Sequence, residues 1–162
     1  MKNNDIEKSF IEMIRLNDRI IYKVCSFYIS SDRSLEDLYQ EVVSNLWIGY
    51  PKFRHESSIS TWIYRVALNT CISELRKGKN KPKNVAFAEL QDAFIQPEDM
   101  TAKIEEMYSL IYQLKKLERA VILLYLEEKS YQKIATITGL TVNNVAVKLK
   151  RIKEKLVKMS NQ

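Results

Sequence analysis

The sequence has few of the residues that hairpins, metal sites and membrane segments require. Three glycines and three prolines among 162 residues leave few places for turns between strands, which predicts an all-helical chain. His55 is the only histidine, so a multi-histidine metal site is excluded and a histidine-based catalytic triad has little support. No apolar run approaches the ~20 residues that a membrane span needs, and the N-terminus does not read as a secretory signal.

Cysteine is also scarce. Cys25 and Cys71 lie inside apolar segments, and neither has neighbours at the spacing of metal ligands. We therefore predict two buried thiols in a reducing cytoplasm rather than a disulfide or a metal pair. The sequence predicts no cofactor, no metal ion and no small-molecule substrate.

Positive charge is concentrated in two windows of the chain. Residues 65–83 hold six lysines or arginines and one glutamate. Residues 141–162 also hold six lysines or arginines and one glutamate. Each window carries +5 and the whole chain +6, so the remainder carries 6 − 10 = −4. Two positive windows on an otherwise acidic chain indicate two contacts with a polyanion, of which nucleic acid is the first candidate.

Hydrophobic periodicity predicts two small helical domains joined by a flexible linker. Residues 1–77 form the first domain, residues 78–100 the linker and residues 101–162 the second domain. Ser60 is the predicted N-cap of the third helix. Helices are predicted over residues 6–28, 35–48, 61–77, 101–117, 117–127 and 131–138, with a last helix starting at residue 142.

A short helix, a glycine and a longer basic helix follow one another near the C-terminus. Ser130 is predicted to cap the first helix, Gly139 supplies the positive φ that ends it, and Thr141 caps the second. We interpret the pair as a helix-turn-helix whose second helix enters the DNA major groove; a purely structural helical hairpin is the alternative. Its predicted inward residues are Val142, Val145, Ala146, Leu149, Ile152 and Leu156. Its predicted duplex-binding residues are Thr141, Asn143, Asn144, Val147, Lys148, Arg151 and Lys155.

The predicted helix over residues 61–77 carries an indole, an amide and two guanidinium groups on one side, which are poor core material. We interpret Trp62 as a stacking platform for an unpaired base, with cations holding the phosphates. The preceding loop, RHESSIS, would wall a pocket for a flipped base. Satellite packing of the tryptophan is the alternative. The predicted single-strand-binding residues are Trp62, Arg65, Asn69, Ser73 and Arg76.

The predicted helix over residues 35–48 has an acidic outer side. Asp37 and Glu41 are four residues apart, but without a third ligand they make a weak metal site. A solvated face is the common reading of such a pattern, and a docking surface for a basic protein partner is the functional one. The predicted docking residues are Asp37, Gln40, Glu41 and Ser44.

These three segments, in this order, resemble those of the extracytoplasmic-function (ECF) class of bacterial RNA polymerase sigma factors. SLEDLYQEVVSNLW resembles the polymerase-binding segment. SISTWIYRVALNTCISELRK resembles the segment that melts and reads the minus-ten promoter element, with Trp62 and Asn69 on motif positions. SYQKIATITGLTVNNVAVKLKRIKEKL resembles the helix-turn-helix that reads the minus-thirty-five element. The resemblance implies a region 2 helical bundle, a linker and a region 4 helix-turn-helix.

The chain departs from the family pattern at a few positions. Lys116–Leu117 stands where a proline is frequent, and Leu68 where an arginine is frequent. Val147 stands where a small polar residue is common and could contact a thymine methyl, so we expect the recognised promoter to differ from that of relatives.

The resemblance implies a non-catalytic, cytoplasmic specificity subunit. Such a subunit binds core RNA polymerase through the clamp coiled coil of the largest subunit, recognises promoter DNA and is held inactive by an anti-sigma factor, in some cases at the inner membrane face. Linking two weak DNA readers raises their joint affinity. We expect the apolar residues within 85–95 to make contacts in the bound state, and no regulatory domain after the last helix.

Two other functions stay open from the residues alone. A stand-alone helix-turn-helix regulator would use residues 1–77 for dimerisation or effector binding, but this leaves the Trp62–Asn69 stripe and the acidic helix unexplained. A small nucleic-acid enzyme would use Asp37 and Glu41, although no nucleophile, base or complete metal set accompanies them.

Overall fold

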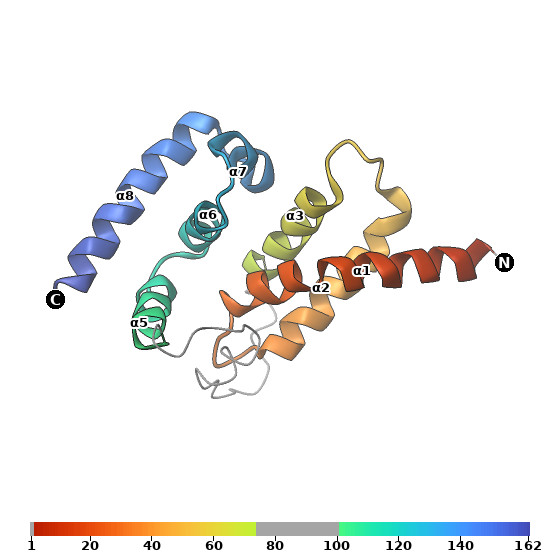
Figure 1. Ribbon diagram of the computed structural model, residues 1–162, viewed down its shortest axis with the longest axis horizontal. Coiled ribbons are helices and arrows are strands. Elements are labelled where there is room, and N and C mark those ends of the chain that lie inside the picture. Colours follow the sequence, from red (N-terminus) through yellow and green to blue (C-terminus); the bar gives the residue numbers. More distant parts are fainter. Residues whose placement is uncertain (1, 74–100) are drawn as a thin grey trace. The chain divides into compact units, whose positions relative to one another are not determined.

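The computed structural model describes residues 2–73 and 101–162, and these form helices and the turns between them. The predicted all-helical fold is therefore confirmed for this part of the chain. The chain divides into two compact units, Met1–Val85 and Ala86–Gln162 (Figure 1). The predicted linker, the domain bounds at residues 77 and 100, Arg76 and the apolar residues within 85–95 lie outside the described residues.

The N-terminal unit is built from three helices that each pack against the other two: α1 (Lys2–Ser26), α2 (Leu35–Gly49) and α3 (Ile59–Ile72). A short 3₁₀ turn, η1 (Tyr50–Lys52), with Pro51 at its start, follows α2 directly. The apolar faces of the three helices form the core of this unit. Its fully buried members include Ile21, Val24, Leu38, Val42, Leu46, Ile63 and Ala67.

The helix α1 is longer at its start and shorter at its end than predicted. It kinks at Asn17, whose φ of −120° is not helical and whose side-chain amide donates to the Met13 carbonyl at 2.8 Å. Beyond its last residue, Phe27 and Tyr28 are 2% and 5% exposed, so the chain stays buried after the helix has ended. The apolar pattern therefore continues beyond the helix, because these residues are buried although they are not helical.

Two other helix limits correct the prediction. The N-cap of α3 is Ser58 rather than Ser60, because the Ser58 hydroxyl accepts from the Thr61 backbone N–H at 3.2 Å. The predicted boundary at residue 117 is also wrong: α5 (Thr101–Tyr112) ends earlier, and α6 (Lys116–Leu126) starts where the Glu118 carboxylate accepts from the Lys115 N–H at 2.9 Å.

The C-terminal unit continues with α7 (Tyr131–Thr138) and α8 (Val142–Ser160), and α6, α7 and α8 pack against one another. Arg119 closes the end of α5 by donating to the carbonyls of Tyr112 and Leu114. The core of this unit includes Ile111, Leu114, Val121, Leu123, Leu124, Ile134, Ile137, Val145, Leu149 and Ile152.

The two cysteines meet inside the N-terminal unit, one on α1 and one on α3. Both are free and buried, as predicted. A hydrogen bond with Cys71, together with burial, raises the pKa of the Cys25 thiol. Thiols in such surroundings stay protonated and unreactive. In the part of the chain that the structure describes, no group of acidic, histidine or cysteine side chains is suited to hold a metal ion, and no helix has the length and apolarity of a membrane span.

Candidate nucleic-acid interface

The predicted helix-turn-helix is present with the predicted caps. Ser130 accepts from the Lys133 N–H to start α7, and Thr141 accepts from the Asn144 N–H to start α8. Gly139 between them has φ 82°, the left-handed conformation that glycine adopts at low cost. This turn lets the short α7 brace the N-terminal half of the long α8.

The inner face of α8 is set by Val145, Leu149 and Ile152, which are at most 1% exposed. Val142, predicted to lie inward, is instead 45% exposed, because the first turn of the helix extends beyond the core. The opposite side is open, as a helix that enters a groove requires. Its exposed predicted residues are Thr141, Asn143, Asn144, Val147 and Arg151, and Lys148 is half-buried.

Lys155 differs from the other predicted DNA-binding residues. Its ammonium contacts the Glu118 carboxylate on α6 at 3.3 Å, so it braces α8 against α6. Partial burial opposes ionisation of Glu118, but hydrogen bonds from the Lys115 N–H and Lys155 outweigh it, and the pKa of the Glu118 carboxyl is lowered. A second brace joins Lys153 to the Tyr125 hydroxyl at 2.9 Å. These contacts show that the basic side of α8 is partly structural.

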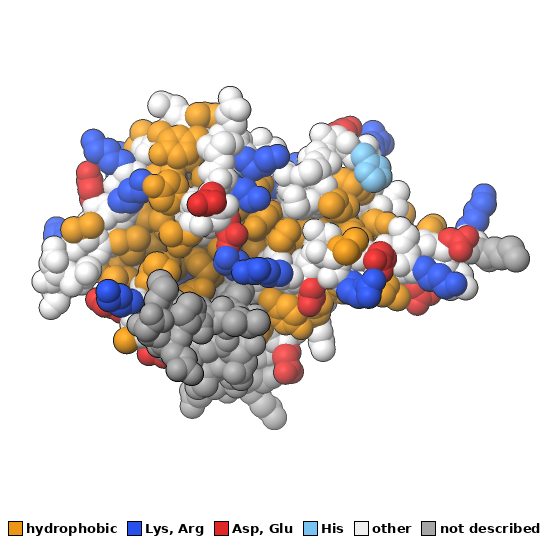
Figure 2. Space-filling view, in the orientation of Figure 1, with side chains coloured by type: hydrophobic (Ala, Val, Ile, Leu, Met, Phe, Trp, Pro, Cys, Tyr) orange, Lys and Arg blue, Asp and Glu red, His pale blue; other side chains and the backbone are white. Residues whose placement is uncertain are grey.

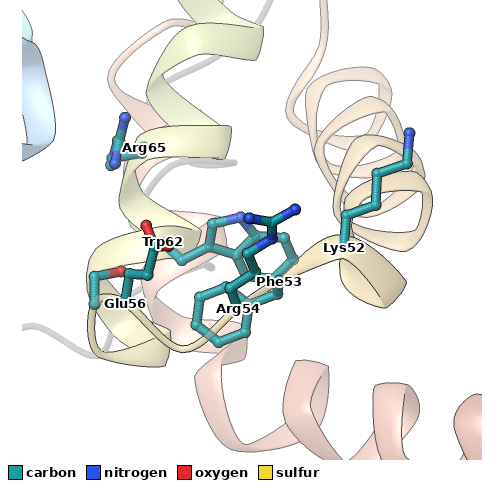
Figure 3. Close-up of a pocket in the computed structure, with 7 residues that line it drawn as sticks. Lys52, Phe53, Arg54, Glu56, Trp62 and Arg65 are labelled. Carbon is teal, nitrogen blue, oxygen red and sulfur yellow. The ribbon is translucent and has the colours of Figure 1, made fainter.

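The N-terminal unit holds a pocket at the start of α3. Its volume is about 200 Å³ (Figure 3). The loop between η1 and α3 walls it, as predicted for RHESSIS, and Trp62 and Arg65 line it from α3. Three cations and one carboxylate surround an aromatic surface, an arrangement able to take a flat, polar, anion-bearing unit. The lining residues are Lys52, Phe53, Arg54, Glu56, Ser57, Trp62 and Arg65.

Trp62 is less exposed than predicted, because other aromatic rings hold it. Its indole stacks on the Phe53 ring with centroids 4.8 Å apart, and the Tyr50 ring lies 6.4 Å away. Behind it, a Cβ atom at Gly49 would lie only 3.2 Å from the indole. Trp62 therefore both packs against neighbouring rings and lines the edge of the pocket, whereas the sequence analysis treated packing and base stacking as alternatives.

The loop that walls the pocket contains His55 in a left-handed conformation, with φ 59°. Its ring packs against Phe53 at 4.5 Å between centroids, and the histidine lies at the surface in Figure 2. Non-glycine residues with positive φ are uncommon and concentrate at functional sites. The conformation turns the loop back over the start of α3.

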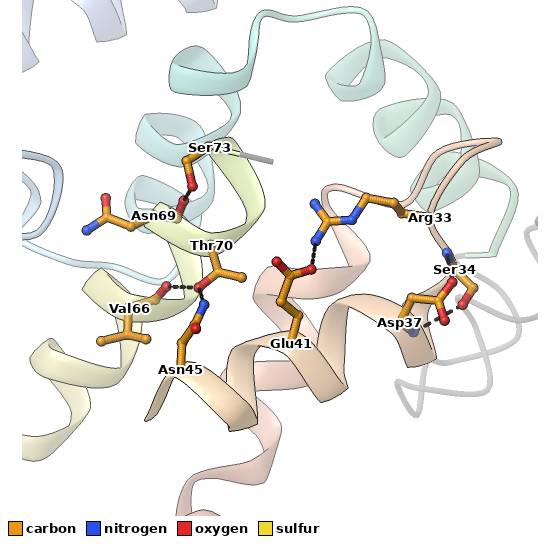
Figure 4. A network of polar contacts seen from close by, with 9 residues as sticks. All are labelled: Arg33, Ser34, Asp37, Glu41, Asn45, Val66, Asn69, Thr70 and Ser73. Carbon is orange, nitrogen blue, oxygen red and sulfur yellow. Dashed lines mark hydrogen bonds and ion pairs between the residues drawn. The ribbon is translucent and has the colours of Figure 1, made fainter. Parts of the chain in front are cut away.

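The stripe on α3 continues beyond the pocket to Asn69 and Ser73. These two residues and Arg65, which also lines the pocket, are exposed, as predicted. The Ser73 hydroxyl donates to the Asn69 backbone carbonyl at 2.6 Å, which helps to end the helix (Figure 4). The amide of Asn69 is therefore presented on the outer side of α3.

The acidic side chains of α2 make more contacts within the chain than the sequence suggested. Asp37 forms a capping box with Ser34, in which each side chain accepts from the other residue's backbone N–H. Glu41 pairs with the guanidinium of Arg33, whose side chain is only 3% exposed (Figure 4). Of the four predicted docking residues, only Gln40 and Ser44 are fully on the outside.

The helices α2 and α3 are joined by a polar contact. The Asn45 amide donates to the Thr70 hydroxyl at 2.9 Å, and that hydroxyl donates to the Val66 carbonyl (Figure 4). This contact holds the exposed side of α2 at a defined angle to the stripe on α3.

Sequence reasoning missed several residues of these sites. Lys52 and Phe53 line the pocket but lie before the loop that was predicted to wall it and belong to no periodic element, so spacing gave no signal for them. The clue available was the cluster of aromatic residues around the proline that follows α2. Arg33 was missed because a buried arginine in a turn cannot be told from a solvated one without its partner.

Models of two protein families match the chain. Sigma-70 region 2 matches residues 13–81, and sigma-70 region 4 matches residues 104–156. The chain is 32% identical over 130 residues to the RNA polymerase sigma factor YlaC of Bacillus subtilis, covering 76% of this chain and 75% of that protein. It is 25% identical over 166 residues to the ECF RNA polymerase sigma factor SigW of the same organism, covering 94% and 89%.

Among the solved structures with the same fold are two complexes. The sigma factor RpoE of Bartonella quintana, in complex with the anti-sigma factor NepR, superposes with a TM-score of 0.73 at 18% identity, over 95% of this chain and 98% of that one. CnrH, in complex with the cytosolic domain of CnrY, superposes with a TM-score of 0.68 at 17% identity, over 96% and 89%. Both likenesses concern the fold.

Proposed function

Because the chain belongs to the extracytoplasmic-function class of RNA polymerase sigma factors, which direct core polymerase to promoters, we propose that its two units read two states of promoter DNA. The C-terminal unit reads duplex and the N-terminal unit reads an unpaired base. The observation that carries this division is the contrast between the flat, exposed side of α8 and the open, aromatic-lined pocket at α3. A stand-alone regulator would require neither this pocket nor the region 2 match over residues 13–81.

The proposal for the duplex rests on the outer side of α8. Asn143, Asn144 and Val147 occupy the first turns, where a groove-bound helix reaches base edges, and their amides and apolar surface suit adenine and the thymine methyl. Arg151 lies one turn further on and is exposed, so it suits either a base or a phosphate. Together these residues read the minus-thirty-five element.

The proposal for the unpaired base rests on the pocket. The indole of Trp62, fixed by Phe53, provides a rigid stacking surface, and stacking on an aromatic ring is how proteins hold unpaired bases. Lys52, Arg54 and Arg65 line the same pocket and would neutralise the phosphates on either side of the base. Strand separation at the minus-ten element would follow from capture of that base.

The docking proposal rests on α2. Its exposed side presents Gln40 and Ser44, flanked by the half-buried carboxylates of Asp37 and Glu41, to the clamp coiled coil of the largest polymerase subunit. Since RpoE and CnrH were both solved with a partner bound, we extend to this chain control by an anti-sigma factor in the cytoplasm. The subunit would supply specificity and carry out no reaction of its own.

The direct test is run-off transcription with purified core polymerase over a library of genomic promoters. We expect transcripts from a small set that shares two elements. Absence of any start site, together with tight duplex binding by the chain alone, would replace this proposal with the stand-alone regulator.

A docking test uses Gln40→Lys with Ser44→Lys, because these positions carry no contact that holds the fold. We expect loss of co-purification with core polymerase and an unchanged circular dichroism spectrum. The matched control is Asn3→Lys with Asn4→Lys on the exposed start of α1, which adds the same charge and should still co-purify. Retained binding by the α2 variant would place the docking surface elsewhere.

A further inference from the structure

The pocket contains one acidic side chain among its cations, and this is unexpected in a site for a polyanion. Glu56 lines the pocket together with Lys52, Arg54 and Arg65. It is exposed, and Figure 3 shows it beside the start of α3 that carries Trp62. A carboxylate adds repulsion toward phosphate, so its value to the site has to come from contact with the base.

The loop conformation places this carboxylate in the wall of the pocket. His55 turns the chain through a left-handed conformation immediately before Glu56, and Ser58 then starts α3. Phe53, two residues earlier than His55, packs on both His55 and Trp62. The loop is therefore anchored by ring contacts on the same indole that would stack with the base.

The chemistry of a carboxylate restricts which base it accepts. An ionised glutamate only accepts hydrogen bonds, so it needs an N–H group on the base. Cytosine, adenine and guanine each carry an exocyclic amino group, whereas thymine presents two carbonyl oxygens on either side of its single N–H. A carboxylate placed against that edge faces a carbonyl oxygen, and two acceptors that face one another repel instead of forming a hydrogen bond.

We propose that Glu56 makes the pocket select a base with an exocyclic amino group and reject thymine. This inference rests on the proposed function of the pocket as the site for an unpaired base. It adds a specificity residue in the loop, outside the helical stripe to which the sequence pointed.

The experiment uses the full chain with core polymerase and a promoter set that carries each of the four bases at each position of the minus-ten element. Run-off transcription gives the base preference at each position. Trp62→Ala identifies the position that depends on the pocket, since its base preference should be lost there. At that position we expect thymine to be used about tenfold less than the best amino-bearing base.

Glu56→Gln is the decisive variant, because an amide donates as well as accepts and so tolerates a carbonyl. We expect the thymine penalty to fall below about threefold, while preferences at the other positions and at the minus-thirty-five element stay unchanged. Glu56→Ala should lower the penalty in the same way. Glu7→Gln, an exposed glutamate on α1, is the matched control and should retain the full penalty.

The outcomes separate the two levels of the proposal. An unchanged thymine penalty in both Glu56 variants, or thymine as the preferred base at the Trp62-dependent position, overturns the role of Glu56 and leaves the base pocket intact. If Trp62→Ala alters no base preference anywhere, the pocket is not a base site, and both the pocket proposal and this inference fail.

Discussion

The exposed side of α8, proposed to read duplex DNA, and the pocket at α3, proposed to hold an unpaired base, are built in opposite ways. The α8 residues come from one helix, and the inner face of that helix packs independently of what its outer side carries. The pocket draws on η1, a loop and α3, and its central ring is also part of the packing. Apart from the Lys155 contact with Glu118, function and stability are therefore separable on α8, and they are joined in the N-terminal unit.

That difference extends to the charged residues. On α8, Arg151 is exposed and is expected to matter mainly when DNA is present. On α2, the carboxylate of Glu41 pairs with the almost entirely buried guanidinium of Arg33. The charge of Glu41 therefore stabilises the fold whether or not a partner is bound. The following changes test the separation, beginning with the largest expected effect.

The first change is Glu41→Ala, which leaves the buried guanidinium of Arg33 without this carboxylate. We expect the N-terminal unit to lose about 3 kcal/mol of unfolding free energy, as when one member of a buried ion pair is removed. Both tryptophans lie in this unit, so urea unfolding followed by tryptophan fluorescence reports it directly. Gln40→Ala, on the exposed neighbour, should change stability by less than about 0.5 kcal/mol. Equal stability of the two variants would refute the structural role of the pair.

The second change is Trp62→Ala, which removes the stacking surface of the pocket. We expect strand opening to weaken by about 2 kcal/mol, while binding of the closed promoter changes little. Permanganate reactivity of unpaired thymines measures opening, and a gel-shift assay at low temperature measures closed binding. Trp62→Phe keeps an aromatic face and should retain most of the opening. Equal loss in both steps would argue against base stacking.

The third change is Arg151→Ala on the exposed side of α8. We expect promoter affinity to fall by about 1–3 kcal/mol if the guanidinium reaches a base, with relaxed specificity at one position, and a uniform loss if it contacts phosphate. Stability should not change, in contrast to Glu41→Ala. Lys103→Ala removes an equal charge from the exposed part of α5 and serves as the control. Unaltered transcription from a cognate promoter would remove Arg151 from the interface.

The smallest effect is expected for Glu118→Gln, which weakens the contact between α6 and α8. Because the pKa of the Glu118 carboxyl is lowered in the folded chain, its contribution is present above the unfolded pKa of about 4.3 and is lost as the pH falls through the lower folded value. We expect the variant to lose less than about 1 kcal/mol near neutral pH and to show a weaker decline in acid. Hydrogen exchange of the α6 and α8 amides measures this. Identical acid profiles would show that the pair does not contribute.

The same contrast explains what could be predicted from the sequence. Caps and one-helix faces depend on residues close together in the chain, so Ser130, Gly139, Thr141 and the inner side of α8, except Val142, were predicted correctly. The pocket wall was anticipated from its loop, but the stacking of Phe53 on Trp62 depends on how a turn packs against a helix. Lys155 was predicted to contact DNA, and its pairing with Glu118 could not be predicted because Glu118 lies 37 positions earlier in the chain.

Gly49 has a consequence for how the N-terminal unit moves. It is the last residue of the 15-residue helix α2, and a Cβ atom there would lie only 3.2 Å from the indole of Trp62. If core polymerase binds the outer side of α2, as proposed, a displacement of this short helix would press on the aromatic ring at its far end. Under that proposal, polymerase binding and the shape of the pocket would be connected through one helix.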